Sequence, residues 1–162
     1  MLPSDHFVRF YSEVFKFLEK QGSGHLEKYW LEISHHQERH CLELFKEKGL
    51  QGMYDYWEHI RIEENCDLTL KLSDDCLHSR MNKCPSLSKV LDSDAEPSKR
   101  YCEHCAGWVG PLLLKAGYYY VTVTGEPDVP QCESWIYSNK GKALAKIQEL
   151  KDKKNKFKSY IN

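Results

Sequence analysis

The sequence predicts a single α+β domain, with N-terminal helices packed on a small antiparallel sheet and a C-terminal helix. Three observations support this prediction. Apolar residues recur every three or four positions in residues 1–65, as they do along one face of a helix. Residues 66–137 form a cysteine-bearing part in which alternating or β-branched runs occur together with helical segments, and a helical pattern returns in residues 138–162. A chain of 162 residues has the usual length of one domain.

The N-terminal part is expected to form three helices. The first has an apolar stripe formed by Phe7, Phe10, Tyr11, Val14, Phe15, Phe17 and Leu18. Gly22 and Gly24 break this helix, and the second runs from about His25 to Lys48. Gly49 is placed to end the second helix as a C-terminal cap, and a third begins near Gly52.

Four segments are expected to be strands. Residues 67–72 alternate apolar and polar side chains, and residues 76–81 form a plausible return strand of a hairpin. Residues 118–124 are rich in aromatic and β-branched side chains, and residues 132–137 resemble them. A turn is expected at residues 125–128, where glycine and proline occur together.

The remaining segments are expected to be helical or irregular. A short helix is predicted around Ser88–Leu91, and a longer one over Cys102–Ala116. A lysine-rich helix begins at Lys140, and the polar tail from Lys151 onward is expected to fray.

Composition excludes several classes of partner. Lys and Arg total 23 and Asp and Glu total 24, so no overall positive field would attract nucleic acid or an anionic membrane. No apolar run has the ~20 residues of a membrane span, and the N-terminus lacks the apolar core of a secretory signal. We therefore expect a cytoplasmic protein. In that reducing compartment, the seven cysteines are expected to be ligands, reactive thiols or packing residues rather than disulfides.

Four cysteines in the second half are the strongest functional signal. Cys84, Cys102, Cys105 and Cys132 have the spacing C-x17-C-x2-C-x26-C, and each lies at the edge of an expected element. Thiolates so arranged can bind one soft metal ion or an iron–sulfur cluster. Zinc is the favoured metal, whereas the dipeptide of Cys84 and Pro85 is a small argument for the cluster. His104 is a fifth candidate ligand.

Other interpretations of these cysteines remain open. Free cysteine is often a small buried apolar residue, and Cys102 with Cys105 could form a redox-active pair. Cys66 and Cys76 flank the first expected strand, so they could replace a member of the ligand set, and Cys41 could be a packing residue.

A second metal site is conceivable in the helical part. His36 and His40 are four residues apart, as are His59 and Glu63, so each pair faces one way on its helix. The alternative is that these residues belong to a solvated helix face. Numerous tyrosines and tryptophans could also line a pocket for a small-molecule ligand, although packing explains most of them.

The order of motifs in residues 67–137 resembles two related families of ligand-binding domains. The matching residues are Lys83-Cys84-Pro85, Tyr101-Cys102, Gly107-Trp108-Val109 and Cys132 followed by Glu133-Ser134-Trp135-Ile136. This order is similar to that of L-2-amino-thiazoline-4-carboxylic acid hydrolase-like proteins and of 4-vinyl reductase-related domains. The resemblance implies helices packed on an antiparallel sheet, with a cysteine-lined site.

The leading functional hypothesis is a metal-binding protein that hydrolyses a small sulfur- or nitrogen-containing molecule. A metal-bound water or a thiolate would be the nucleophile, and Glu103 or His104 would transfer the proton. The alternative is a module without enzymatic activity, which senses a ligand or binds a protein while the metal holds sheet and helix together. Four thiolates leave no open position on zinc, so a complete shell favours the structural role.

Overall fold

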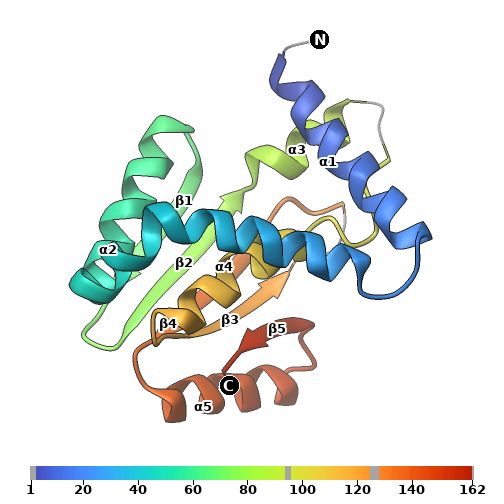
Figure 1. Ribbon diagram of the computed structural model, residues 1–162. Coiled ribbons are helices and arrows are strands. Elements are labelled where there is room, and N and C mark those ends of the chain that lie inside the picture. Colours follow the sequence, from blue (N-terminus) through green and yellow to red (C-terminus); the bar gives the residue numbers. More distant parts are fainter. Residues whose placement is uncertain (1–2, 94–95, 125–127, 162) are drawn as a thin grey trace.

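The computed structural model describes residues 3–93, 96–124 and 128–161 (Figure 1). Its helices are α1 (Pro3–Lys20), α2 (His25–Glu63), α3 (Pro85–Asp92), α4 (Glu103–Lys115) and α5 (Lys140–Asp152). Its strands are β1 (Asp67–Leu72), β2 (Cys76–Lys83), β3 (Tyr119–Thr124), β4 (Cys132–Tyr137) and β5 (Phe157–Tyr160). The predicted α+β class is confirmed.

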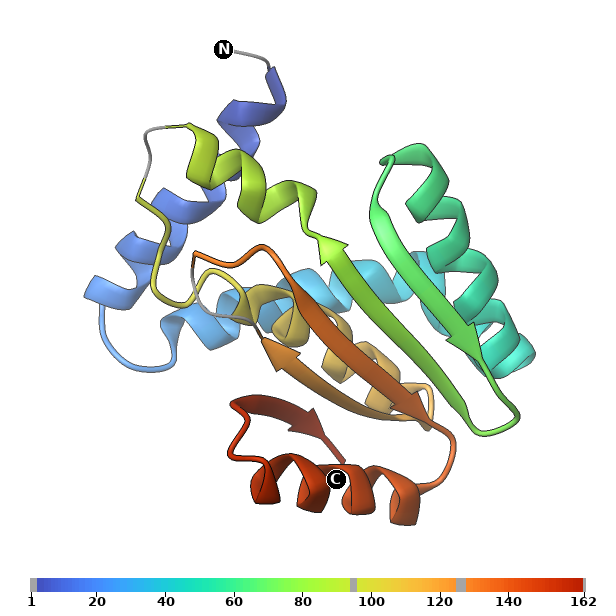
Figure 2. The same ribbon diagram turned by 180° about the vertical axis from the view of Figure 1, so that it is seen from behind.

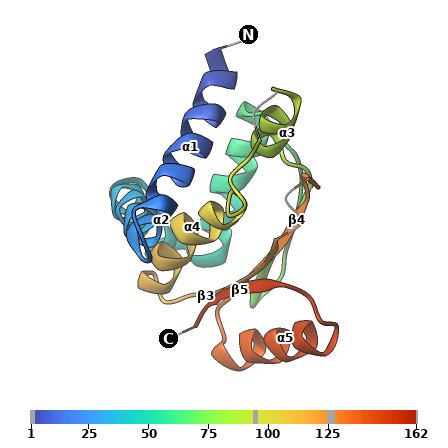
Figure 3. The same cartoon turned by 90° about the vertical axis from the view of Figure 1, so that its right-hand side faces the viewer.

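The strands form one antiparallel sheet with the order β1-β2-β4-β3-β5 (Figure 2). Helices α2 and α4 cover one face of this sheet, and α5 lies against the other (Figure 3). Because side chains alternate along a strand, each central strand contributes to both layers. Tyr120 and Ile136 pack into the core beneath α2 and α4, whereas Val121 and Trp135 pack against α5.

Gly49 changes the direction of the second helix. Its backbone has φ 58° and ψ −142°, so the helical path is interrupted there, but helix resumes at once and continues to Glu63. The second helix was expected to end at this glycine, and α2 indeed consists of two helices joined across a kink there. Any other residue would be strained at this positive φ, and its Cβ atom would also lie 2.7 Å from the hydroxyl of Tyr118, which would have to move.

The expected strands at residues 67–72 and 132–137 have the bounds of β1 and β4, and β2 runs two residues beyond the expected return strand. The short helix expected around Ser88–Leu91 is α3, which begins earlier, at Pro85. Proline at the first position of a helix is favoured because its missing N–H has no helical partner. The turn expected at residues 125–128 falls largely outside the described residues.

The prediction that the C-terminal tail frays is wrong. Phe157–Tyr160 forms β5, which pairs with β3 and places Tyr160 opposite Tyr120. The ring of Tyr160 lies directly against Gly110 of α4, where no Cβ atom would fit. Phe157 packs on the opposite face, against the α5 core. Alternation over four residues therefore anchors the tail on both faces of the sheet.

Candidate functional site

The beginnings of two helices and of one strand meet at one end of the sheet. Cys84 is the N-cap of α3, Cys102 directly precedes α4, and Cys105 lies in the first turn of α4. Cys132 is the first residue of β4. Sheet register places Cys132 beside Met81 of β2 and Thr124 of β3.

One backbone hydrogen bond joins the segment before β4 to the start of α3. The amide of Cys84 donates to the carbonyl of Pro130 at 2.6 Å. Since Pro130 is two residues before Cys132, this bond holds the two cysteine-bearing segments together. The sulfur of Cys84 in turn accepts from the amide of Leu87 at 3.5 Å, which orients the thiol at the helix start.

The four cysteines line one cavity of about 50 Å³. Its walls are mostly apolar, and Leu87 and Tyr120 are among them. Cys105 has exposed surface, whereas Cys84, Cys102 and Cys132 are partly buried. The structure thus brings together all four cysteines that the spacing had singled out.

Burial keeps these thiols protonated. It raises the pKa of Cys105 to about 11 and that of Cys102 to about 12. It also raises the pKa of Cys84 and of Cys132, and neighbouring thiols add to the effect. Cys105 has some exposed surface, but it lines the cavity, and desolvation of its thiol is the main cause of its raised pKa.

His104 is buried beside the cavity and is held by its neighbours. Its ring packs 4.5 Å from Trp108 and 5.0 Å from Tyr101, measured between ring centroids. Nδ1 lies against the carbonyl oxygen of Tyr101, so this nitrogen carries the proton and donates it. Nε2 is then unprotonated and faces Sγ of Cys105 at 3.4 Å. Burial lowers the pKa of His104 to about 4, so the ring is neutral at pH 7.

Glu103 lies outside the cysteine cavity. It lines a separate pocket of about 230 Å³ between α2, α4 and β5. Its carboxylate accepts from Arg100 at 2.7 and 3.0 Å and pairs with Lys158 at 3.0 Å. Burial opposes ionisation, but the hydrogen bonds from these two cations prevail and lower the pKa of Glu103. Of the two expected proton-transfer residues, only His104 lines the cavity.

The side chains around the cavity include suitable donor atoms for a soft metal ion, but these atoms are not yet arranged around a common point. Four thiols are a donor set that zinc and iron accept. Within the described ranges, however, no three histidine, cysteine, aspartate or glutamate side chains are grouped closely enough to hold an ion. Binding would therefore require the thiols to turn toward a common point and to lose their protons.

The helical histidines do not form a second grouped site among the described residues. His36 and His40 are exposed on the first part of α2. His59 pairs with Glu63 at 3.2 Å, and both are exposed on the part after the kink. These pairs behave as solvated helix faces.

The other three cysteines have separate surroundings. Cys41 is buried in the core with Phe45, and Cys76 packs at the edge of the α5 core. Cys66 directly precedes β1. Burial is the main cause that raises the pKa of its thiol, and the nearby Glu64 and Cys84 raise it further. Cys66 is thus the nearest candidate for exchange with a member of the ligand set.

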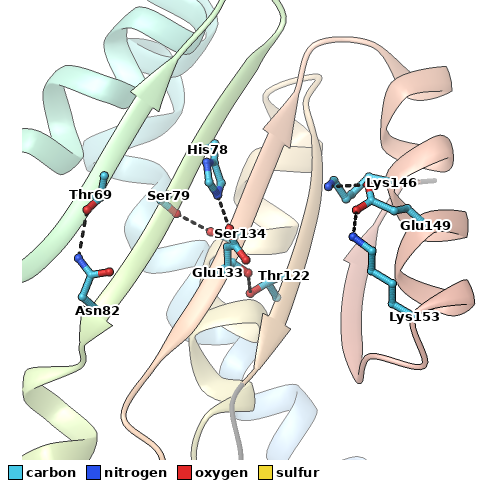
Figure 4. A network of polar contacts seen from close by, with 10 residues as sticks. All are labelled: Thr69, His78, Ser79, Asn82, Thr122, Glu133, Ser134, Lys146, Glu149 and Lys153. Carbon is cyan, nitrogen blue, oxygen red and sulfur yellow. Dashed lines mark hydrogen bonds and ion pairs between the residues drawn. The ribbon is translucent and has the colours of Figure 1, made fainter.

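Several hydroxyl groups lie next to the cavity on the sheet face that α2 and α4 cover. Thr122 lines the cavity and donates to the carbonyl of Glu133 at 3.2 Å, and the hydroxyls of Ser79 and Ser134 are 2.6 Å apart (Figure 4). His78 pairs with Glu133 at 2.7 Å. Sequence reasoning missed Thr122 as a lining residue, although alternation in β3 places it on the same face as buried Tyr120.

Comparisons of the chain with models of known families, with curated proteins and with solved structures find no match. The resemblance to hydrolase-like and reductase-related domains therefore stays a prediction. No helix in the described part of the chain is long and apolar enough to cross a membrane.

Proposed function

We propose that this protein binds a soft metal ion through Cys84, Cys102, Cys105 and Cys132, with zinc as the favoured metal. The supporting observation is that four cysteines from three separate segments line one small cavity. A shared cavity is not required of cysteines that serve only as packing residues, and Cys41 and Cys76 lie in other parts of the core.

The size of the cavity favours an ion over an organic ligand. About 50 Å³ is far below the roughly 300–1,000 Å³ of typical small-molecule pockets. A single zinc ion also needs less space than a cluster of several iron and sulfur atoms, which remains the alternative cofactor. A reducing cytoplasm, which we propose as the location, would keep the thiols available for either.

Metal content per chain tests this proposal. We expect about one zinc per chain after anaerobic purification, with loss of most of it in Cys105→Ser. Cys76→Ser is the matched control, because it removes a partly buried thiol outside the cavity. A brown protein that contains iron and sulfide would show that the cofactor is an iron–sulfur cluster rather than zinc. Absence of metal, together with seven thiols that titrate freely after zinc addition, would refute the proposal.

A second candidate function is hydrolysis of a small sulfur- or nitrogen-containing molecule by the thiol of Cys105. The supporting observation is the 3.4 Å contact between Sγ of Cys105 and unprotonated Nε2 of His104. In such a step, sulfur would bond to an electrophilic carbon while its proton moves to Nε2. The imidazolium would then protonate the leaving group, and water would release the product from sulfur.

Alkylation by iodoacetamide separates this candidate from a purely structural metal site. Sulfur displaces iodide, and Nε2 accepts the thiol proton. In metal-free protein, we expect Cys105 to be alkylated faster than the other cavity thiols, and we expect His104→Asn to remove that advantage. Equal rates in both proteins would exclude His104 as a base for Cys105. The function would then be the non-enzymatic one, in which a complete thiolate shell joins α3, α4 and β4.

A further inference from the structure

The first helix has a stripe of large apolar side chains that remain in solvent. Phe7, Phe10 and Phe17 are 63%, 60% and 60% exposed. Other apolar residues of α1 are turned inward, among them Phe15, which is fully buried against Trp30. Helix α1 lies at the edge of the molecule, packed on α3 and α2, so its outer side faces away from the sheet (Figure 3).

The spacing of the stripe is symmetric. With the partly exposed Val14, the stripe occupies positions 7, 10, 14 and 17, so its intervals are three, four and three residues. Positions with this spacing form the seam of a two-helix pairing. Two antiparallel copies of α1 would place Phe7 of one chain against Phe17 of the other, and Phe10 against Val14. A two-fold axis produces this self-complementary arrangement.

The charges of α1 favour a protein partner over a lipid surface. Helices that bind anionic membranes have a polar face rich in unpaired lysine and arginine. In α1, Lys16 pairs with Glu13 at 2.8 Å, and Arg9 donates to the carbonyl of Ser93. The helix also contains as many aspartate and glutamate residues as lysine and arginine residues, three of each, so its polar face has no net positive charge.

We propose that the protein forms a two-fold dimer in which the α1 helices of two copies pair antiparallel through Phe7, Phe10, Val14 and Phe17. A phenylalanine that is 60% exposed offers roughly 120 Å² of surface, so the three rings offer about 360 Å² per chain. This is about half of the ~800 Å² per partner in a standard stable interface, which predicts a weak, concentration-dependent dimer. This proposal is independent of the metal site.

Sedimentation velocity of the full-length protein at several concentrations tests the dimer. We expect Phe10→Glu to raise the dissociation constant at least about a hundredfold, because each chain loses an apolar contact at the two-fold seam. Ile62→Glu is the control, because Ile62 is 64% exposed on α2 outside the stripe. Circular dichroism checks that both variants are folded. A wild-type protein that stays monomeric at all concentrations, or a dimer that Phe10→Glu leaves intact, would overturn the proposal.

A charge pair tests the direction of pairing. In the double variant Phe7→Lys with Phe17→Glu, an antiparallel dimer places each lysine opposite a glutamate of the other chain. Parallel pairing would place like charges together. We expect the double variant to dimerise more strongly than Phe7→Lys alone. Weaker association of the double variant would exclude the antiparallel arrangement, and binding of wild-type protein to anionic vesicles without dimerisation would assign the stripe to a membrane.

Discussion

Acidification should destabilise the metal-free protein through one buried histidine. Burial lowers the pKa of His104 from 6.5 to about 4, and this shift corresponds to about 3 kcal/mol. Between these pH values, the unfolded chain binds a proton that the folded chain does not bind. The free energy of unfolding therefore falls as the pH decreases from 6.5 to about 4, and the contribution is fully present above that range.

The variant His104→Asn isolates this contribution. An asparagine amide can donate to the carbonyl of Tyr101 as Nδ1 does, but it does not titrate. We expect the variant to be less stable at pH 7, because it loses the ring contacts with Phe15 and Trp108. Its disadvantage should shrink by up to about 3 kcal/mol at pH 4, since only the wild type has the histidine penalty.

Urea unfolding at pH 7, 6, 5 and 4, followed by tryptophan fluorescence after treatment with a chelator, measures the difference directly. Carboxylates titrate in both proteins, so their effect cancels in the comparison. If the wild type and the variant differ by the same free energy at every pH, His104 is not held neutral by burial. The assignment of Nε2 as an unprotonated base facing Cys105 would then be wrong.

Three further predictions follow from packing and from the thiols. Gly110→Ala should lower the free energy of unfolding by about 2 kcal/mol, because the added Cβ would overlap the ring of Tyr160. In a protein that also has Tyr160→Ala, the same substitution should be neutral or stabilising. Urea unfolding measures both effects. Cys132→Ser should lower the zinc content, because it removes a thiol that lines the cavity. Cys41→Ser should keep the zinc but lower the free energy of unfolding by about 1–3 kcal/mol, because it buries a hydroxyl in the core. Stability should fall as the pH rises above about 9, because the unfolded chain loses thiol protons that the folded chain retains, and alkaline unfolding curves would measure this.

The main strands could be predicted because their sequence patterns are local. Residues 67–72 alternate apolar and polar side chains, and residues 132–137 end in the aromatic and β-branched run Trp135-Ile136-Tyr137, so no distant contact is needed to identify either strand. The tail differs in this respect. Phe157–Tyr160 is short and lies between lysines, and its strand exists because it pairs with β3 and places Tyr160 on Gly110. Neither contact is visible in the local sequence, which alone favours a frayed end.

The residues of the candidate site could be predicted from the sequence, but the directions of their side chains could not. Spacing at element edges indicated that Cys84, Cys102, Cys105 and Cys132 would meet, and they line one cavity. Successive residues on a helix point about 100° apart, so Glu103 faces another pocket than its neighbours do. Spacing alone cannot determine how the first turn of α4 is rotated. That rotation depends on packing against α2, where Gly107 leaves room for Trp30.

Two opposing effects act on the thiols at this end of the sheet. Helix starts stabilise negative charge, and Cys84 and Cys105 lie at the starts of α3 and α4. Burial disfavours the same charge, and it prevails, because the pKa of both thiols is raised. A divalent cation would reverse this balance, since a thiol that coordinates a metal is deprotonated outright. Iodoacetamide reactivity before and after zinc addition therefore distinguishes ligands from packing residues: zinc should protect the cavity thiols and leave the reactivity of Cys76, which packs in the α5 core, unchanged.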